Sequence, residues 1–212
     1  YDAFIEDCHA AGLKVTVVAD LMALALLKPL DADIVCGTAQ RFGLPMGFGG
    51  PTAGYMATRD EYKRDMPGRI IGLSKDLYEH PAYRLALQTR EQHIKREKAT
   101  SNICTAEALS AMMVAFYAEY HGAEGLRAIA ENIHGKAVYL SEMLQAYGYT
   151  QENSEFFDTL TIYLPEGVTV EALKQAAEEA EINLYYAPEG WVGLSLDETV
   201  TVDDMNDLAE QI

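Results

Sequence analysis

Three short apolar runs, separated by turn residues, most constrain how this chain can fold. The β-branched run at residues 14–19 follows an amphipathic stretch at 2–11, and such runs are typical of strands buried on both faces of a parallel sheet. Similar runs at 33–38 and 53–57 predict two further strands, and LMALALLKP predicts a short buried helix that ends at Pro29. This alternation predicts an α/β sheet with too few strands to be complete, so we expect part of a larger domain.

The middle of the chain is expected to be a connector. Thr58-x-x-Glu61 has capping-box spacing for the start of a helix, and Thr89-x-x-Gln92 has the same spacing for a second one. Apart from that second helix, residues 67–104 are predicted to be irregular and polar.

From Thr105 the pattern changes to that of an α+β unit. A helix is expected at 105–122, ending at Gly122, and a longer one at 123–147 with Gly148 after its end. The buried stripe of the longer helix is predicted to be Leu126, Ile129, Ile133, Val138, Leu140 and Leu144. The remaining expected elements are strand 158–164, helix 170–180, strands near 183–187 and 191–196, and a helix from 202 that Thr201-x-x-Asp204 could cap.

The composition limits the classes of partner. A formal charge of −17 and a pI near 4.5 argue against nucleic acid or an anionic membrane as the main partner, since either would require a basic footprint. No apolar run approaches the roughly twenty residues that span a bilayer. Residues 59–100 hold ten of the sixteen Lys and Arg, whereas 151–212 hold fifteen acids and only Lys174. The acidic part predicts a solvated surface, and the basic middle is the better place for an anion or a partner.

Cysteine and histidine usage restricts the compartment and the chemistry. Three cysteines, Cys8, Cys36 and Cys104, without Cys-x-x-Cys spacing favour reduced thiols in a cytosol-like compartment. We therefore expect a cytoplasmic protein, or one of the mitochondrial matrix if the source is eukaryotic. The five histidines have no short ligand spacing, so no metal site is predicted.

The segment GTAQRFGLPMGFGGPTAGYMATRD, at 37–60, is rich in glycine and contains no lysine. Gly47, Gly49 and Gly50, followed by Pro51, allow positive φ angles and close backbone approach. Successive N–H groups here could form an anion nest, or the glycines could simply serve a tight turn. Neither a Walker A motif nor a dinucleotide-binding fingerprint is present.

Two longer strings carry a family resemblance. DADIVCGTAQRFGLPMGFGGPTAGYMATRDEYKRDMPGRIIGLSKD and LALQTREQHIKREKATSNICTAEAL closely resemble the pyridoxal phosphate (PLP) dependent glycine decarboxylases of the glycine cleavage system, the P-protein family. The resemblance runs from about residue 5 to residue 150 and is to the N-terminal, non-catalytic half. It implies the C-terminal part of a fold-type-I PLP-dependent transferase large domain, at 1–58. An interface connector at 59–104 and a small α+β domain at 105–212 would follow.

In this family glycine condenses with PLP and loses CO2, and the aminomethyl group passes to the lipoyl arm of the H-protein. The resemblance implies two partners, the catalytic half of the P-protein and the lipoyl H-protein. The catalytic half carries a His-Lys pair whose lysine forms the Schiff base, and this sequence has Ala39-Gln40 there. Because an amide cannot form an imine, no catalytic residue is expected in this chain. Lys28, Lys63 and Lys75 are predicted to be surface residues.

The resemblance also gives the glycine-rich segment a role. We expect the N–H groups of Gly49 and Gly50, with the Thr52 hydroxyl, to touch the phosphate of the PLP held by the partner half. Asp20 falls where the family places the carboxylate that pairs with the pyridinium nitrogen, or it could be a strand-end or capping residue.

The basic segment, with Arg90, Lys95, Arg96 and Lys98 near Gln92, His93, Ser101 and Asn102, could line the interface between halves or present isolated surface charges. Two alternatives to the family function remain: a structural or H-protein-docking module without cofactor contact, and a different fold-type-I PLP enzyme with an undetected lysine. A sheet without its earlier strands would expose its edge, so self-association is also expected.

Overall fold

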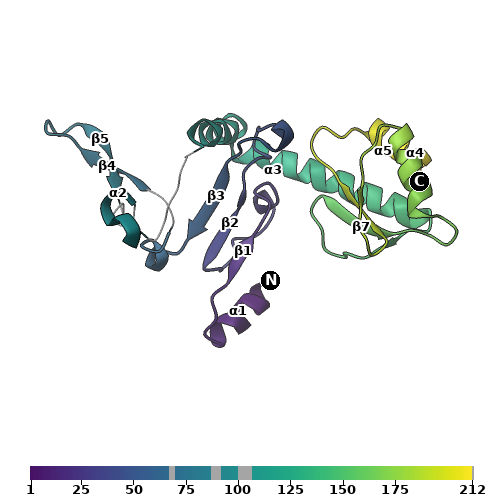
Figure 1. Cartoon of the computed structure of the whole chain (residues 1–212), viewed down its shortest axis with the longest axis horizontal. Helices are drawn as coiled ribbons and strands as arrows, with labels where there is room; N and C mark the ends of the chain where they lie inside the picture. Colours follow the sequence, from purple (N-terminus) through teal and green to yellow (C-terminus); the bar gives the residue numbers. More distant parts are fainter. Residues whose placement is uncertain (67–69, 87–91, 100–106, 212) are drawn as a thin grey trace. The chain divides into compact units, whose positions relative to one another are not determined.

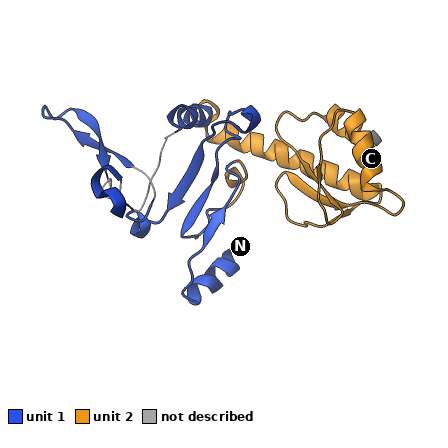
Figure 2. Ribbon diagram, in the orientation of Figure 1, with its two compact units in different colours: residues 1–21, 28–119 blue, residues 22–27, 120–212 orange. Residues whose placement is uncertain are grey.

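The computed structural model describes residues 1–66, 70–86, 92–99 and 107–211. The chain forms two compact units (Figure 2). Unit 1 comprises Tyr1–Leu21 and Lys28–Glu119, and unit 2 comprises Met22–Leu27 and Tyr120–Ile212. The three-part division of the sequence stays a prediction, and its boundary at Thr105 lies outside the described residues.

Unit 1 contains a three-stranded sheet, visible in Figure 1 as β1, β2 and β3 side by side. β1 (Thr16–Val18) pairs in parallel with β2 (Ile34–Thr38), and β2 pairs antiparallel with β3 (Gly54–Thr58). α1 (Asp2–Ala10) precedes β1 and buries Ile5 in a small core with Val15 and Ala32. The expected helix and three strands are therefore confirmed.

Two predicted helices, one before Pro29 and one starting near Thr58, are wrong. The segment before Pro29 forms only a 3-10 turn, η1 (Ala23–Ala25), and short helical segments have little stability of their own. After β3 there is again a single 3-10 turn, η3 (Asp60–Tyr62). The position before η3 is Arg59, without a side-chain cap, and the Thr58 hydroxyl donates a 3.0 Å hydrogen bond to the Asp33 carbonyl.

A β-hairpin lies where an irregular connector was expected. β4 (Ile70–Lys75) and β5 (Pro81–Ala86) pair antiparallel over six residues each. In the turn, the Asp76 carboxylate accepts hydrogen bonds from the N–H groups of Tyr78 and His80. α2 (Gln92–Lys95) and η4 (Arg96–Lys98) follow as short helical turns, and the predicted cap Thr89 lies outside the described residues.

The long helix α3 (Ala108–Ala146) covers both helices predicted after the connector. Gly122, with φ 63° and ψ −178°, interrupts its helical geometry, which confirms the predicted break. Gly148, just beyond the end of α3, has a φ of 90°, a value that favours glycine. Within the predicted stripe, Ile133, Leu140 and Leu144 are buried, whereas Leu126, Ile129 and Val138 are half-buried.

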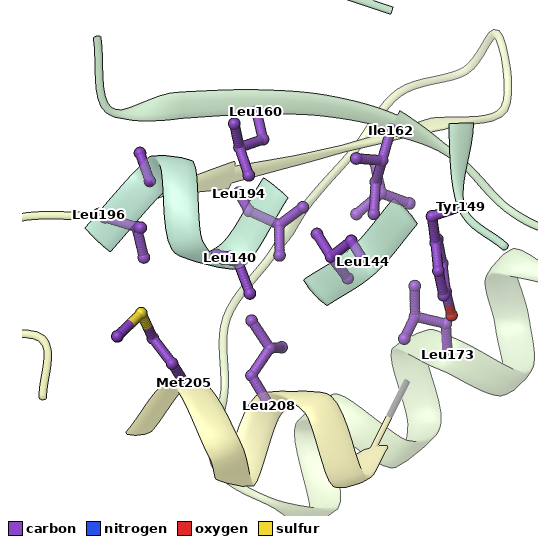
Figure 3. Packing of buried hydrophobic residues seen from close by; sticks show 12 residues of the cluster. Leu140, Leu144, Tyr149, Leu160, Ile162, Leu173, Leu194, Leu196, Met205 and Leu208 are labelled. Atoms are coloured by element: carbon purple, nitrogen blue, oxygen red, sulfur yellow. The ribbon is translucent and has the colours of Figure 1, made fainter. Parts of the chain in front are cut away.

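Unit 2 is an antiparallel sheet with helices. The strand order is β6 (Thr150–Gln151), β7 (Thr159–Tyr163), β9 (Trp191–Ser195) and β8 (Tyr185–Tyr186). α4 (Val170–Glu179) and α5 (Val202–Gln211) complete it, so all the predicted elements are confirmed and β6 is added. Figure 3 shows side chains from α3, the sheet and both helices meeting in one core. Among the described residues, no helix has the length and apolar character needed to cross a membrane.

Candidate site at the carboxyl ends of β1 and β2

The two parallel strands of unit 1 bring Asp20 and Gln40 to the same edge of the sheet. Asp20 follows β1 and Gln40 follows β2, and parallel strands end at a common edge, where open α/β sheets bind their ligands. Arg41 also lies here, and its Nε is 3.0 Å from Asp20 Oδ2. The Arg41 and Asp20 side chains are 21% and 32% exposed, so this ion pair is partly shielded from solvent.

Close backbone packing holds this edge together. A Cβ atom at Gly37 would lie 2.4 Å from the Ala19 carbonyl oxygen, so only glycine fits between β1 and β2 at this point. The Tyr55 hydroxyl of β3 donates a 2.9 Å hydrogen bond to the same oxygen. Burial raises the pKa of Tyr55, and the neighbouring Asp20 carboxylate adds to that shift. Tyr55 is thus a neutral hydrogen-bond donor at neutral pH.

Gln40 serves the conformation of the loop. Its side-chain Nε2 donates a 3.0 Å hydrogen bond to the Pro45 carbonyl, and its backbone N–H donates to the Thr38 hydroxyl at 3.2 Å. The base of the loop is closed where the Ala39 N–H donates to the Ala53 carbonyl at 2.8 Å. The Gln40 side chain therefore stabilises the conformation of the glycine-rich loop.

The tip of the glycine-rich loop has an unusual backbone. Gly47, Phe48 and Gly49 form the 3-10 turn η2 with φ angles of 55°, 54° and 79°. Met46 before them is right-handed, and a right-handed residue followed by a left-handed one is the arrangement of an anion nest. The sequence left an anion nest and a simple tight turn both open, and the family resemblance named the N–H groups of Gly49 and Gly50 as phosphate donors.

The predicted phosphate donors are placed as follows. The Gly49 N–H donates to the Met46 carbonyl at 3.1 Å, and the Gly50 N–H donates to the Gly47 carbonyl at 3.0 Å. Gly49, Gly50 and Thr52 are all exposed to solvent. Two of the three predicted donors thus already have a partner within the loop, and an anion there would share them in three-centre hydrogen bonds.

The lysines considered as alternatives lie on the surface. Lys28, Lys63 and Lys75 are exposed, as predicted. Lys63 Nζ is 2.7 Å from Asp60 Oδ2, and Lys75 Nζ is 2.7 Å from Glu79 Oε2.

The basic segment is only partly described. Lys95, Arg96 and Lys98 are exposed on α2 and η4, and Arg96 has a φ of 52°. Arg90, Ser101 and Asn102 lie outside the described residues, as does Cys104. Cys8 and Cys36 are free thiols.

A second polar cluster surrounds Asp33, next to the amino end of β2, which is the opposite end from Gln40. Asp33 is 3% exposed, and its Oδ2 accepts hydrogen bonds from the Val15 N–H at 2.7 Å and from His9 Nε2 at 2.9 Å. The Tyr62 hydroxyl donates to Oδ1 at 3.0 Å, and Lys14 Nζ is 3.9 Å from the same oxygen.

Sequence reasoning missed this cluster and also missed Arg41. The available signals were an acid at the start of an apolar run, for Asp33, and an arginine directly after Gln40. The Asp33 carboxylate accepts hydrogen bonds from three neighbouring groups. We therefore interpret Asp33 as a residue that stabilises the fold of unit 1.

Comparisons with known proteins identify the family. The model of the family "Glycine cleavage system P-protein" matches residues 1–212. A glycine dehydrogenase (decarboxylating) from Bacteroides thetaiotaomicron is 56% identical over 209 residues, which are 97% of this chain and 22% of that protein. One from a Nostoc species is 56% identical over 211 residues, 98% of this chain and 21% of that protein. The chain thus spans about a fifth of the length of these curated relatives.

Solved structures agree with this assignment. A crystal structure of glycine decarboxylase (P-protein) of the glycine cleavage system, in inhibitor-bound form, superposes with a TM-score of 0.90 at 35% identity, over 98% of this chain and 49% of that one. Glutamate decarboxylase from Lactobacillus brevis shares the fold, with a TM-score of 0.67 at 15% identity, over 99% of this chain and 48% of that one. The fold is therefore that of the fold-type-I PLP enzymes. Because the family model covers every residue, the chain belongs to the glycine cleavage system P-protein family.

Proposed function

We propose that this chain is part of a PLP-dependent glycine decarboxylase, in the half that lacks the cofactor-binding lysine. The whole protein would release the carboxyl group of glycine as CO2 and pass the aminomethyl group to the lipoyl arm of the H-protein. Family membership supports the reaction class. The assignment to the lysine-free half is supported by the residues at the carboxyl ends of β1 and β2.

The observation that carries the proposal is the amide at position 40. By resemblance, Gln40 occupies the position of the Schiff-base lysine, and its side chain is hydrogen-bonded to the Pro45 carbonyl. Asp20, which corresponds to the partner of the pyridinium nitrogen, is instead paired with Arg41. These residues do not fit covalently held PLP, because there is no amine at position 40 and the carboxylate already has a cation.

The glycine-rich loop would then act on the partner half. We assign to Gly49, Gly50 and Thr52 the positioning of the phosphate of the PLP held there. Uncharged donors are suited to this role, since a dianion that basic groups already neutralise requires positioning more than additional charge. Thr52 is exposed, which leaves its hydroxyl accessible to such a ligand.

Covalent trapping tests the absence of a cofactor lysine. The chain is incubated with PLP, reduced with borohydride and digested, and its peptides are analysed by mass spectrometry, with the lysine-bearing half as the positive control. We expect that no lysine of this chain carries reduced PLP in a stoichiometric amount. A specific adduct, together with glycine turnover by this chain alone, would instead support an independent PLP enzyme.

Substitution of Thr52 tests the loop contact. In the complete protein, Thr52→Val should lower kcat/KM for glycine decarboxylation about tenfold, because a hydrogen bond to a charged group is lost. Thr150→Val, at an exposed threonine of β6, should leave kcat/KM unchanged. Wild-type activity of Thr52→Val would favour the alternative of a structural or H-protein-docking module.

A further inference from the structure

The two central strands of the unit 2 sheet have one face buried in the core. Leu160 and Ile162 of β7 and Val192 and Leu194 of β9 are at most 2% exposed, and they belong to the core that Figure 3 shows. Because successive side chains of a strand point to opposite faces, the residues that alternate with these four lie on the other face. We call it the outer face of the unit 2 sheet.

Three aromatic side chains gather on the outer face. Tyr163 of β7 pairs with Trp191 of β9, and Tyr185 of β8 pairs with Gly193 of β9. The ring centroids of Tyr185 and Trp191 are 5.3 Å apart, with an angle of 42° between the ring planes. A Cβ atom at Gly193 would lie 3.4 Å from both of these side chains, so they pack over the glycine backbone.

The aromatic rings of the outer face are accessible to solvent. Tyr185 is 59% exposed, Tyr163 is 38% exposed and Trp191 is half-buried. Farther along the same face, the hydroxyl oxygens of Thr159 and Ser195 are 3.0 Å apart. Accessible aromatic rings beside hydroxyl groups are typical of a binding surface.

A carboxylate lies on the same face. Gln151 of β6 pairs with the buried Ile162, and its side chain accepts a hydrogen bond from the Ser141 hydroxyl on the core side. The Glu152 N–H donates a 2.8 Å hydrogen bond to the Thr161 carbonyl, which continues the pairing by one residue. The alternation of side chains therefore places Glu152, which is exposed, on the outer face.

Charge complementarity selects a cationic occupant for this face. Residues 151–212 hold fifteen acids and a single base, Lys174. Lys174 Nζ lies 5.9 Å from the ring centroid of Tyr186, which packs against the core and so lies on the opposite face of β8 from Tyr185. The one base of this segment is thus on the other side of the sheet, and the aromatic rings and Glu152 are left to a cation from outside.

We infer that the outer face of the unit 2 sheet binds an arginine side chain carried by a basic segment of another protein. A planar guanidinium stacks on the exposed rings of Trp191 and Tyr185 through cation–π attraction, and its N–H groups match a carboxylate such as that of Glu152. A lysine ammonium is a more strongly hydrated point charge and stacks less well. The inference concerns a protein partner of unit 2 and is independent of the reaction under the proposed function.

Fluorescence titration tests this site, because Trp191 is the only tryptophan of the chain and lies on the proposed surface. The 212-residue chain is titrated at low ionic strength with tetra-arginine, tetra-lysine and tetra-proline peptides whose termini are blocked. We expect tetra-arginine to change the Trp191 emission saturably, with a Kd about threefold lower than that of tetra-lysine. Tetra-proline should give no saturable change.

Variants identify the side chains that bind the peptide. Tyr185→Ala should raise the Kd for tetra-arginine about fivefold and Glu152→Gln about threefold, because each removes one attraction to the guanidinium. Tyr185→Phe keeps the ring and should bind as wild type. Glu171→Gln is the charge-matched control, since Glu171 is exposed in the first turn of α4, away from the outer face, and its Kd should stay within about twofold of wild type.

Folding is checked by far-UV circular dichroism. Tyr185 and Glu152 are already exposed, so the spectra of their variants should match that of wild type.

Several results would overturn the inference. Equal Kd values for tetra-arginine and tetra-lysine, or equal weakening by Glu171→Gln and Glu152→Gln, would show that only overall charge attracts the peptides. Saturable binding of tetra-proline would assign the rings to a proline-rich segment. Self-association of the chain in analytical ultracentrifugation that Tyr185→Ala abolishes would assign the face to a second copy. None of these results bears on the trapping and Thr52→Val experiments, which test the proposed function separately.

Discussion

Asp33 is the residue that most clearly ties the elements of unit 1 together. Its carboxylate binds the Val15 N–H, the His9 ring and the Tyr62 hydroxyl, so one side chain joins α1, the start of β1 and η3. The hydrogen bond from Val15 is the main cause that holds the pKa of Asp33 far below its usual range, with His9 and Tyr62 contributing and burial opposing. The folded chain therefore strongly favours the ionised form.

The sign of the pH effect follows from that direction. Because the pKa of Asp33 is lower in the folded than in the unfolded chain, its stabilising contribution is complete above the unfolded pKa of about 4 and is lost as the pH falls below it. We predict that Asp33→Asn lowers the urea midpoint of unit 1 at pH 7. The difference in urea midpoint between Asp33→Asn and wild type should be constant down to about pH 4 and should shrink as the pH falls from there to pH 3.

Asp60→Asn provides the control, because Asp60 is an exposed partner of Lys63. The urea midpoint of Asp60→Asn should differ little from that of wild type at every pH. A difference between Asp33→Asn and wild type that stays constant from pH 7 to pH 3 would show that the network does not depend on the charge of Asp33.

At the scale of the element, α5 shows how a local motif secures a helix. The Thr201 hydroxyl accepts a hydrogen bond from the Asp204 N–H at 3.1 Å, and Asp204 Oδ2 accepts one from the Thr201 N–H at 2.7 Å. These reciprocal bonds form a capping box. Hydrogen bonds from the Thr201 hydroxyl and from the Thr201 N–H to the Asp204 carboxylate lower the pKa of Asp204. They hold in place the helix that contributes Met205 and Leu208 to the core of unit 2.

Removing this cap should destabilise unit 2 measurably. We predict that Thr201→Ala lowers its unfolding free energy by about 1 kcal/mol, because the N–H groups of the first turn lose their acceptor. Urea unfolding followed by Trp191 fluorescence is the measurement, since Trp191 is the only tryptophan and lies in β9. Thr201→Ser, which keeps the hydroxyl, should restore most of the loss.

Hydrophobic periodicity in the sequence predicted some of these helices and strands but not others. Strands β1, β2 and β3 and the helices of unit 2 were predictable, because each has an apolar pattern of the correct period. The β4–β5 hairpin was not, because Ile71, Leu73, Tyr83 and Leu85 are exposed and alternate with small or charged residues. Among the residues that the structure describes, these four side chains are not buried in a core, so their pattern gives only a weak strand signal.

At the scale of the whole molecule, unit 2 has a core of its own. The buried residues of its main cluster, among those that the structure describes, lie between Ala137 and Leu208. A continuous segment therefore contains the apolar contacts that a domain needs to fold.

We predict that residues 123–212 fold alone with a cooperative urea transition monitored by Trp191 fluorescence and circular dichroism. A shorter segment starting at residue 134 is the comparison, since it lacks the buried Ala130 and Ile133 and should be less stable. A broad, non-cooperative transition for 123–212 would contradict the independence of this core.

The sequence by itself determined the family, the order of most elements and the chemistry available at position 40. A missing amine is a property of one residue and requires no fold to be recognised. The tertiary structure decided that Asp20 pairs with Arg41, that the N–H groups of Gly49 and Gly50 are engaged within their own loop, and that Phe116 faces solvent. These facts depend on which strand ends meet and on what covers each face, and residues distant in sequence set both.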